Sequence, residues 1–179
     1  GGFLTGYSHG FSFGAAANGV SFGRHVISTG EERFVGQVSR TLGNANSAPL
    51  VGPVVISEVM YHPPDFPGGL DNTTEEYVEL SNIMPAPVSL FDPVYPTNTW
   101  HIRGGVTFDF PENTVLGALQ SLVLVNFAPT NPSAVSAFLS RYGQFNGVPL
   151  FGPYGGKLDN SNDTITLLRP DSPETNTVP

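Results

Sequence analysis

The amino-acid sequence predicts an all-β sandwich with one short helix, preceded by an N-terminal β-hairpin segment. Three observations favour this fold class. The 179 residues include 21 Gly and 17 Pro, a composition typical of a chain with many turns. Short runs of β-branched and aromatic residues recur between the turn signals. One further segment has the apolar period of an amphipathic helix.

Strand-like runs occupy most of the chain after residue 53. They carry β-branched or aromatic residues on one face, which is expected of strands half-buried in a sandwich. Their spacing is irregular, and Gly, Pro or Asn separates them. In chain order the runs are VVISEVMY from Val54, EEYVELSN from Glu75, PVSLFD from Pro87, TWHIRG from Thr99, VTFDF from Val106, SLVLVNF from Ser121 and DTITLLR from Asp163.

The helix is predicted over residues 132–142. Asn131 is a good N-cap and Pro132 suits the first helical position. Gly143 can end the helix. Because its apolar residues recur at i, i+3, i+4 and i+7, we expect one face to pack on the sandwich. These residues are Val135, Phe138, Leu139 and Tyr142.

Four parts are predicted along the chain. Residues 1–48 form a hairpin segment, 49–53 a linker, 54–172 the sandwich and 173–179 a C-terminal tail. The linker lies within GNANSAPLVGP, which is rich in small residues and Pro. The first part holds two or three short strands, too few to fold alone. Since the chain begins at Gly1 without Met, we expect it to be a piece or processed product of a longer protein.

Charge and composition disfavour several function classes. The formal charge of −8 and the scattered basic residues oppose nucleic-acid binding. The absence of Cys excludes disulfides, thiolate zinc sites and a Cys nucleophile. The sequence contains no transmembrane run or signal-peptide pattern, so we expect no membrane insertion.

Acidic residues near two predicted turns are candidate calcium ligands. They are Asp71 and Glu75 before the second sandwich strand, and Asp159 and Asp163 before the last one. No regular calcium loop accompanies them, so turn-forming or solvated roles are the favoured interpretation. Glu58, within an apolar strand, is expected to accept hydrogen bonds from backbone donors. No cofactor is therefore predicted, with calcium kept as the alternative.

The sequence predicts no catalytic residues. Four histidines and many serines are present, and GVSFG formally places Ser21 as the nucleophile of a G-x-S-x-G elbow. Strand patterns flank it, however, and Arg24 follows where a helix should begin. The paired carboxylates Asp109 and Glu112 flank a turn that explains them equally well.

Aromatic side chains are the main candidates for contacts with a partner. Trp100 is predicted to fill the core, as large aromatic residues usually do. Tyr95 and Tyr154 lie beside Pro or Gly and are expected to be exposed, in contact with protein or glycan. Four residues of the hairpin segment complete the predicted interaction set: Phe11, Phe13, Phe22 and Phe34.

The ordered motifs from Val54 to Asp171 resemble the bacterial lamin tail domain. They include VVISEVMYHPP, EEYVELSN, TWHIRGGVTFDFPENTVL, QSLVLVNF and LFGPYGGKLDNSNDTITLLRPD. The resemblance implies an immunoglobulin-like sandwich in a large secreted or surface protein, where such domains look like interaction modules. It implies no catalytic residues.

One departure from the family pattern concerns the closing hairpin, which here stands at the front. Residues 10–26 and 31–47 look like the end of such a domain. The chain is then either a slice across two tandem modules, or its front hairpin completes its own sandwich or that of a neighbour. Unpaired strand edges would allow exchange between copies.

Taken together, the sequence predicts a noncatalytic, extracellular or cell-surface module for interaction or assembly. The expected partner is protein, including other copies of the chain through strand complementation. Two alternatives remain: a calcium-dependent adhesive or glycan-binding domain, and an accessory domain of a hydrolase.

Overall fold

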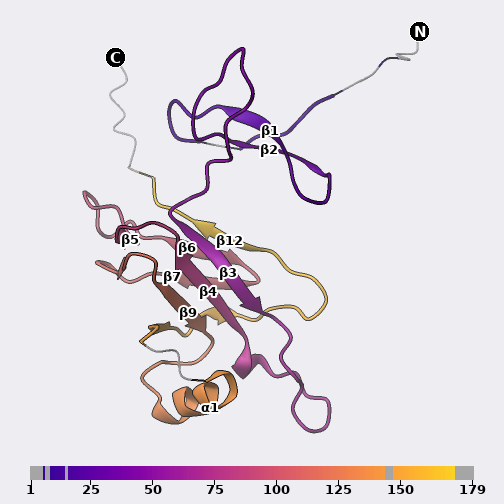
Figure 1. Cartoon of the computed structure of the whole chain (residues 1–179). Coiled ribbons are helices and arrows are strands. Elements are labelled where there is room, and N and C mark those ends of the chain that lie inside the picture. The colour runs from indigo at the N-terminus through magenta and orange to yellow at the C-terminus, as the bar shows by residue number, and fades with distance from the viewer. Residues whose placement is uncertain (1–5, 7–8, 15, 144–146, 172–179) are drawn as a thin grey trace. The chain divides into compact units, whose positions relative to one another are not determined.

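The computed structural model describes residues 6, 9–14, 16–143 and 147–171 (Figure 1). The predicted tail, residues 173–179, lies outside these described residues. The chain divides into two compact units, Gly1–Gly52 and Pro53–Pro179, which are described separately below.

The N-terminal unit is built on an antiparallel hairpin. Strands β1 (Phe22–Val26) and β2 (Glu32–Gly36) pair with Phe22 opposite Gly36. Beyond β2, Gln37 forms a bridge to Pro49, and the Leu50 N–H donates to the Gly36 carbonyl at 2.7 Å. Residues 49 and 50 of the predicted linker therefore pair with the hairpin, and the division between the units follows Gly52. The predicted N-terminal hairpin is confirmed.

The second unit contains a sheet with strand order β10-β9-β4-β3. Its strands pair antiparallel except for β10 and β9, which are parallel. Strand β3 forms one edge of this sheet. The bounds are β3 (Val54–Met60), β4 (Tyr77–Asn82), β9 (Ser121–Val125) and β10 (Leu150–Phe151).

A second, fully antiparallel sheet has the order β11-β7-β6-β12, with β12 at its edge. A short pair, β5 with β8, and the 3-10 turn η1 (Thr73–Glu75) complete the β-rich framework. Each of the seven predicted runs contains a strand. The remaining bounds are β5 (Val88–Ser89), β6 (His101–Gly104), β7 (Val106–Asp109), β8 (Val115–Leu116), β11 (Gly155–Gly156) and β12 (Ile165–Leu168).

The two sheets enclose one apolar core. Val78 and Leu80 of β4 and Leu124 of β9 are fully buried against Ile102 of β6 and Val106 of β7. Alternation along β4 places Val78 and Leu80 on this inner face. Trp100 joins the same core, as predicted. These contacts confirm an all-β, sandwich-like fold with one short helix.

Helix α1 (Pro132–Tyr142) covers the other face of the β4 and β9 strands. The Asn131 side chain caps it by accepting from the N–H groups of Ser133 and Ala134, and the Gly143 N–H donates to the Leu139 carbonyl. The predicted start and end are therefore confirmed. Among the described residues, no helix has the length and apolar character needed to cross a bilayer.

A β-bulge in β3 changes the orientation of Glu58. Pairing with β4 shifts register between Ile56 and Glu58, which leaves Ser57 as an extra residue. Ile56 and Val59 can therefore both pack against the core, while Glu58 turns to the exposed face. The expectation that Glu58 accepts backbone donors is wrong, because its Oε1 instead accepts from the Tyr77 hydroxyl at 2.5 Å.

Candidate interaction surface

The four phenylalanines predicted in the hairpin segment lie together on one face of β1 and β2. We call this group the aromatic cluster. The Phe11 and Phe34 rings stack with centroids 4.7 Å apart and an interplanar angle of 5°. Phe22 lies 6.1 Å from Phe34 and 5.9 Å from Phe13. Prediction from sequence therefore found residues that the fold brings into contact.

Strand register explains why the cluster forms. Arg24 lies opposite Phe34, so Phe22 and Phe34 are diagonal neighbours on one face. Phe11 and Phe13 pack on that face, and Phe13 remains 73% exposed. The hairpin thus presents an apolar surface that its own two strands leave partly open to solvent.

A groove in the second unit lies between the edge strands β3 and β12. It has a volume of about 410 Å³ and contains apolar side chains from both edges: Ile56 and Val59 from β3 and Ile165 from β12. Tyr61, which is half exposed, also contacts it. Figure 1 shows β3 and β12 running beside one another. An apolar groove between two open sheet edges suits an added strand or hairpin.

The acidic end of the groove is a turn formed by residues 158–163. Asp159 Oδ1 accepts from the Ser161 hydroxyl and from the N–H groups of Ser161 and Asn162. The hydrogen bond from the Ser161 side chain is the main cause that lowers the pKa of Asp159. Asp163 accepts from the N–H groups of Asp159 and Thr164. The predicted turn role of this segment is confirmed.

The four candidate calcium ligands do not form one ligand set. Asp71 accepts from Lys157 and Asn160, whereas Glu75 pairs with Arg141 at 3.2 Å. Asp159 and Asp163 are engaged in their own turn. Within the part of the chain that the structure describes, no three His, Asp or Glu side chains gather closely enough to hold a metal ion.

Glu76 lies in an acidic segment that the sequence offers for calcium, but its burial was not predicted. It is fully buried, and its Oε2 accepts from the Leu158 N–H at 3.0 Å and the Tyr154 hydroxyl at 3.2 Å. Burial raises the pKa of the Glu76 carboxyl despite these two donors. The available signal was alternation, which places Glu76 on the same face as the buried Val78.

The two predicted contact tyrosines differ in environment. Tyr154 is 4% exposed and belongs to the core, so its predicted exposure is wrong. Its ring fills apolar space while its hydroxyl satisfies Glu76, an arrangement that suits a buried Tyr. Tyr95 is 41% exposed, on a turn in which Asp92 Oδ1 accepts from the Tyr95 N–H. A contact role for Tyr95 stays a prediction.

The structure gives the histidine and serine candidates other roles. Strand β1 follows Ser21, whose hydroxyl donates to Gln37, so GVSFG does not form a strand-to-helix elbow. His101 and Arg103 both contact Asp109 on the exposed face of β6 and β7. Hydrogen bonding from Arg103 is the largest cause that lowers the pKa of Asp109. This arrangement is a cross-strand ion-pair group.

Comparison with known proteins gives no relative for this chain. No protein-family model, no curated protein and no solved structure matches it. The function must therefore be argued from the two surfaces and from the resemblance noted in the sequence.

Proposed function

We propose that the chain is a noncatalytic assembly module of a secreted or surface protein related to the bacterial lamin tail domain. In this proposal the hairpin of one copy adds to the sandwich of another. The groove between β3 and β12 is the acceptor, and β1 with the aromatic cluster is the donor. The observation that carries the proposal is the apolar groove bounded by two open sheet edges.

Strand geometry supports this pairing of surfaces. A hairpin that joins a sheet edge supplies main-chain partners for the edge and turns one of its faces toward the neighbouring sheet. The aromatic face of β1 and β2 would then cover Ile56, Val59 and Ile165. Without such a cover, a two-stranded hairpin is marginally stable in water.

Strand β12 is a more favourable edge than β3 for pairing with an added strand. The bulge at Ser57 distorts β3, and bulges are one means by which sheet edges discourage pairing. Strand β12 pairs regularly with β6, and the Gly105 N–H donates to the Thr164 carbonyl next to it. Alternation of the ladder therefore directs the main-chain groups of Ile165 and Leu167 away from β6.

The occupant we favour is a second copy of this chain. Its hairpin carries an apolar surface, as the groove does. Repetition of the contact from copy to copy would give an open, head-to-tail assembly. The intramolecular arrangement, in which the hairpin covers its own groove, is an alternative outcome of the test below.

Cross-linking between single-cysteine variants tests the proposal, because the natural chain contains no Cys. Phe13→Cys marks the donor and Tyr61→Cys marks the acceptor; both side chains are exposed. A short bismaleimide should join a mixture of the two variants into a heterodimer. Leu42→Cys, 99% exposed in the same unit as Phe13, is the matched donor control and should cross-link far less.

Sedimentation measured over a concentration series gives a second readout. Phe34→Ser should weaken association at least about tenfold, since it removes the ring stacked on Phe11, whereas Leu42→Ser should leave it unchanged. A concentration-independent monomer whose double-cysteine form cross-links only within one chain would replace the proposal with the intramolecular arrangement. A monomer without either cross-link would refute both.

A further inference from the structure

Glu76 has one carboxylate oxygen that lacks a donor although the side chain is fully buried. Its Oε2 accepts from Leu158 and Tyr154, while its Oε1 has no hydrogen-bond partner among the residues that the structure describes. A buried carboxylate oxygen without a partner is destabilising. The protein groups alone therefore leave this position incomplete.

The Asn160 side chain has a second buried oxygen to which no described group donates. Its Nδ2 donates to Asp71 Oδ1 at 2.9 Å, which fixes the orientation of the amide. The opposite atom, Oδ1, is buried and has no hydrogen-bond partner within the described part of the chain. While Glu76 is ionised, its Oε1 and the Asn160 oxygen are both acceptors, so neither can satisfy the other.

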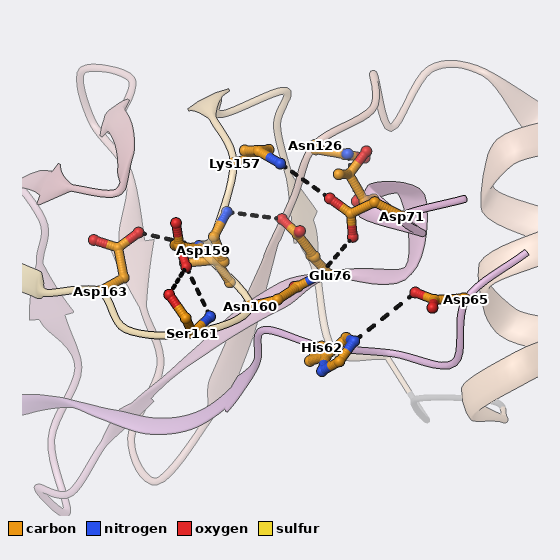
Figure 2. Close-up of polar contacts among 12 residues, drawn as sticks. His62, Asp65, Asp71, Glu76, Asn126, Lys157, Asp159, Asn160, Ser161 and Asp163 are labelled. Carbon is orange, nitrogen blue, oxygen red and sulfur yellow. Dashed lines mark hydrogen bonds and ion pairs between the residues drawn. The ribbon is translucent and has the colours of Figure 1, made fainter. Parts of the chain in front are cut away.

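The charge around these oxygens favours a cation. Asp71 and Glu76 interact electrostatically, and each raises the negative potential at the other. Lys157 Nζ lies 3.1 Å from Asp71 Oδ2, and its side chain is 63% exposed. One ammonium, paired with Asp71, is thus present for two carboxylates. Figure 2 shows Asp71, Glu76, Lys157 and Asn160 grouped together.

We propose that this group is a calcium site, with Glu76 Oε1 and Asn160 Oδ1 as ligands. Asp71 supplies the second negative charge, and water completes the coordination. The ligand atoms are all oxygen, which suits a hard cation. Calcium accepts carboxylate, amide and water oxygens in irregular geometry, whereas magnesium demands a near-ideal octahedron.

The proposal is independent of strand complementation. It draws its residues from the same two acidic segments as the calcium candidates of the sequence, but takes Glu76 and Asn160 as ligands in place of Glu75, Asp159 and Asp163. Because Glu76 immediately precedes β4 and Asn160 lies in the turn before β12, bound calcium would hold the two sheets together at this end of the sandwich. A site with few protein ligands should bind at a dissociation constant on the order of 1 mM, as in extracellular modules.

Terbium luminescence tests the site in the complete chain. Terbium replaces calcium and emits when excited through a nearby tyrosine; the Tyr154 hydroxyl lies 3.2 Å from Glu76 Oε2. We expect emission that calcium displaces and magnesium does not. Calcium should also raise the melting temperature by about 2–4 °C at several times its dissociation constant.

Calcium binding by two ligand variants and one control variant identifies the ligands. Glu76→Gln and Asn160→Ala should each weaken calcium binding at least tenfold, whereas Asp163→Asn in the adjacent turn should leave it unchanged. Circular dichroism verifies that each variant folds, and Asn160→Ala keeps the test valid if Glu76→Gln does not. Absence of calcium-displaceable emission up to about 10 mM calcium would overturn the proposal. So would undiminished binding in the Asn160→Ala variant, or loss of binding in Asp163→Asn alone.

Discussion

The Tyr154 hydroxyl donates to Glu76 Oε2 within the core of the sandwich, at a distance of 3.2 Å. Tyr154 follows β10, and Glu76 immediately precedes β4, so this bond joins segments that are 78 residues apart in sequence. Both side chains are buried. The pair therefore links the segment leading into the second sheet to the first sheet, and it is a structural contact, not a surface for a partner.

Tyr154→Phe should lower the free energy of unfolding by about 2 kcal/mol. The substitution keeps the buried ring but leaves Glu76 Oε2 with only the Leu158 N–H as donor, and hydrogen bonds to charged groups are among the stronger ones. Urea denaturation measures the change. The exposed Tyr95→Phe variant should change stability by less than about 0.5 kcal/mol, and an equal effect in both variants would contradict the structural role.

The carboxyl of Glu76 should make stability fall as the pH rises above 4.5, its ordinary pKa. Burial raises the pKa in the folded state, so the folded chain keeps this proton after the unfolded chain has lost it. The folded state then binds more protons in this interval, and its stability decreases until the pH exceeds the folded-state pKa.

Other carboxyl groups have the opposite effect, so the measurement must be a difference. Hydrogen bonds lower the pKa of Glu32, Asp71, Asp109 and Asp159, and their contributions are lost as the pH falls. We expect the stability of the natural chain relative to Glu76→Gln, measured by urea denaturation in EDTA, to decrease as the pH rises above about 4.5. A difference that increases with pH would show that Glu76 is stabilised as the anion.

Phe138→Ala should cost about 3–5 kcal/mol of stability. Phe138 is 1% exposed and contacts Tyr77 and Tyr142 by its ring, so it is the main anchor of α1 on the first sheet. Near-ultraviolet circular dichroism and thermal melting would report the loss. Ala137→Ser, on the exposed side of the same helix, is the control and should melt within about 2 °C of the natural chain.

Local sequence signals predicted those parts of the fold that depend on neighbouring residues. Asn131 and Gly143 marked the ends of α1 because capping requires particular side chains and backbone angles at fixed positions. Strand runs such as SLVLVNF were found because burial on both faces requires continuous apolar residues. The four phenylalanines of the hairpin segment were named from the sequence, although their contact with one another was not predicted.

Features that depend on distant residues could not be predicted in this way. The bulge at Ser57 reverses the alternation of β3, and only the pairing with β4 reveals that Glu58 faces outward. Tyr154 looked exposed because Pro153 and Gly155 are turn residues, yet its ring fills space between strands remote in sequence. The hydrogen-bond donors to the Glu76 carboxyl come from residues 154 and 158, which are distant in sequence. The sequence therefore does not show that this buried group has partners.

Gly104→Ala should be the most damaging of the small substitutions considered. Gly104 ends β6 with φ 120°, and a Cβ there would lie 1.9 Å from the Thr164 carbonyl oxygen. That oxygen also accepts from the Gly105 N–H, so the backbone cannot move aside without loss of the contact that begins the β6–β12 pairing. We expect a loss of at least about 3 kcal/mol.

Gly68→Ala provides the comparison, because Gly68 has φ 95° but open space around its Cβ position; it should cost about 1 kcal/mol from backbone strain alone. Equal losses in urea denaturation would mean that strain, and not the close approach of β12, requires glycine at position 104.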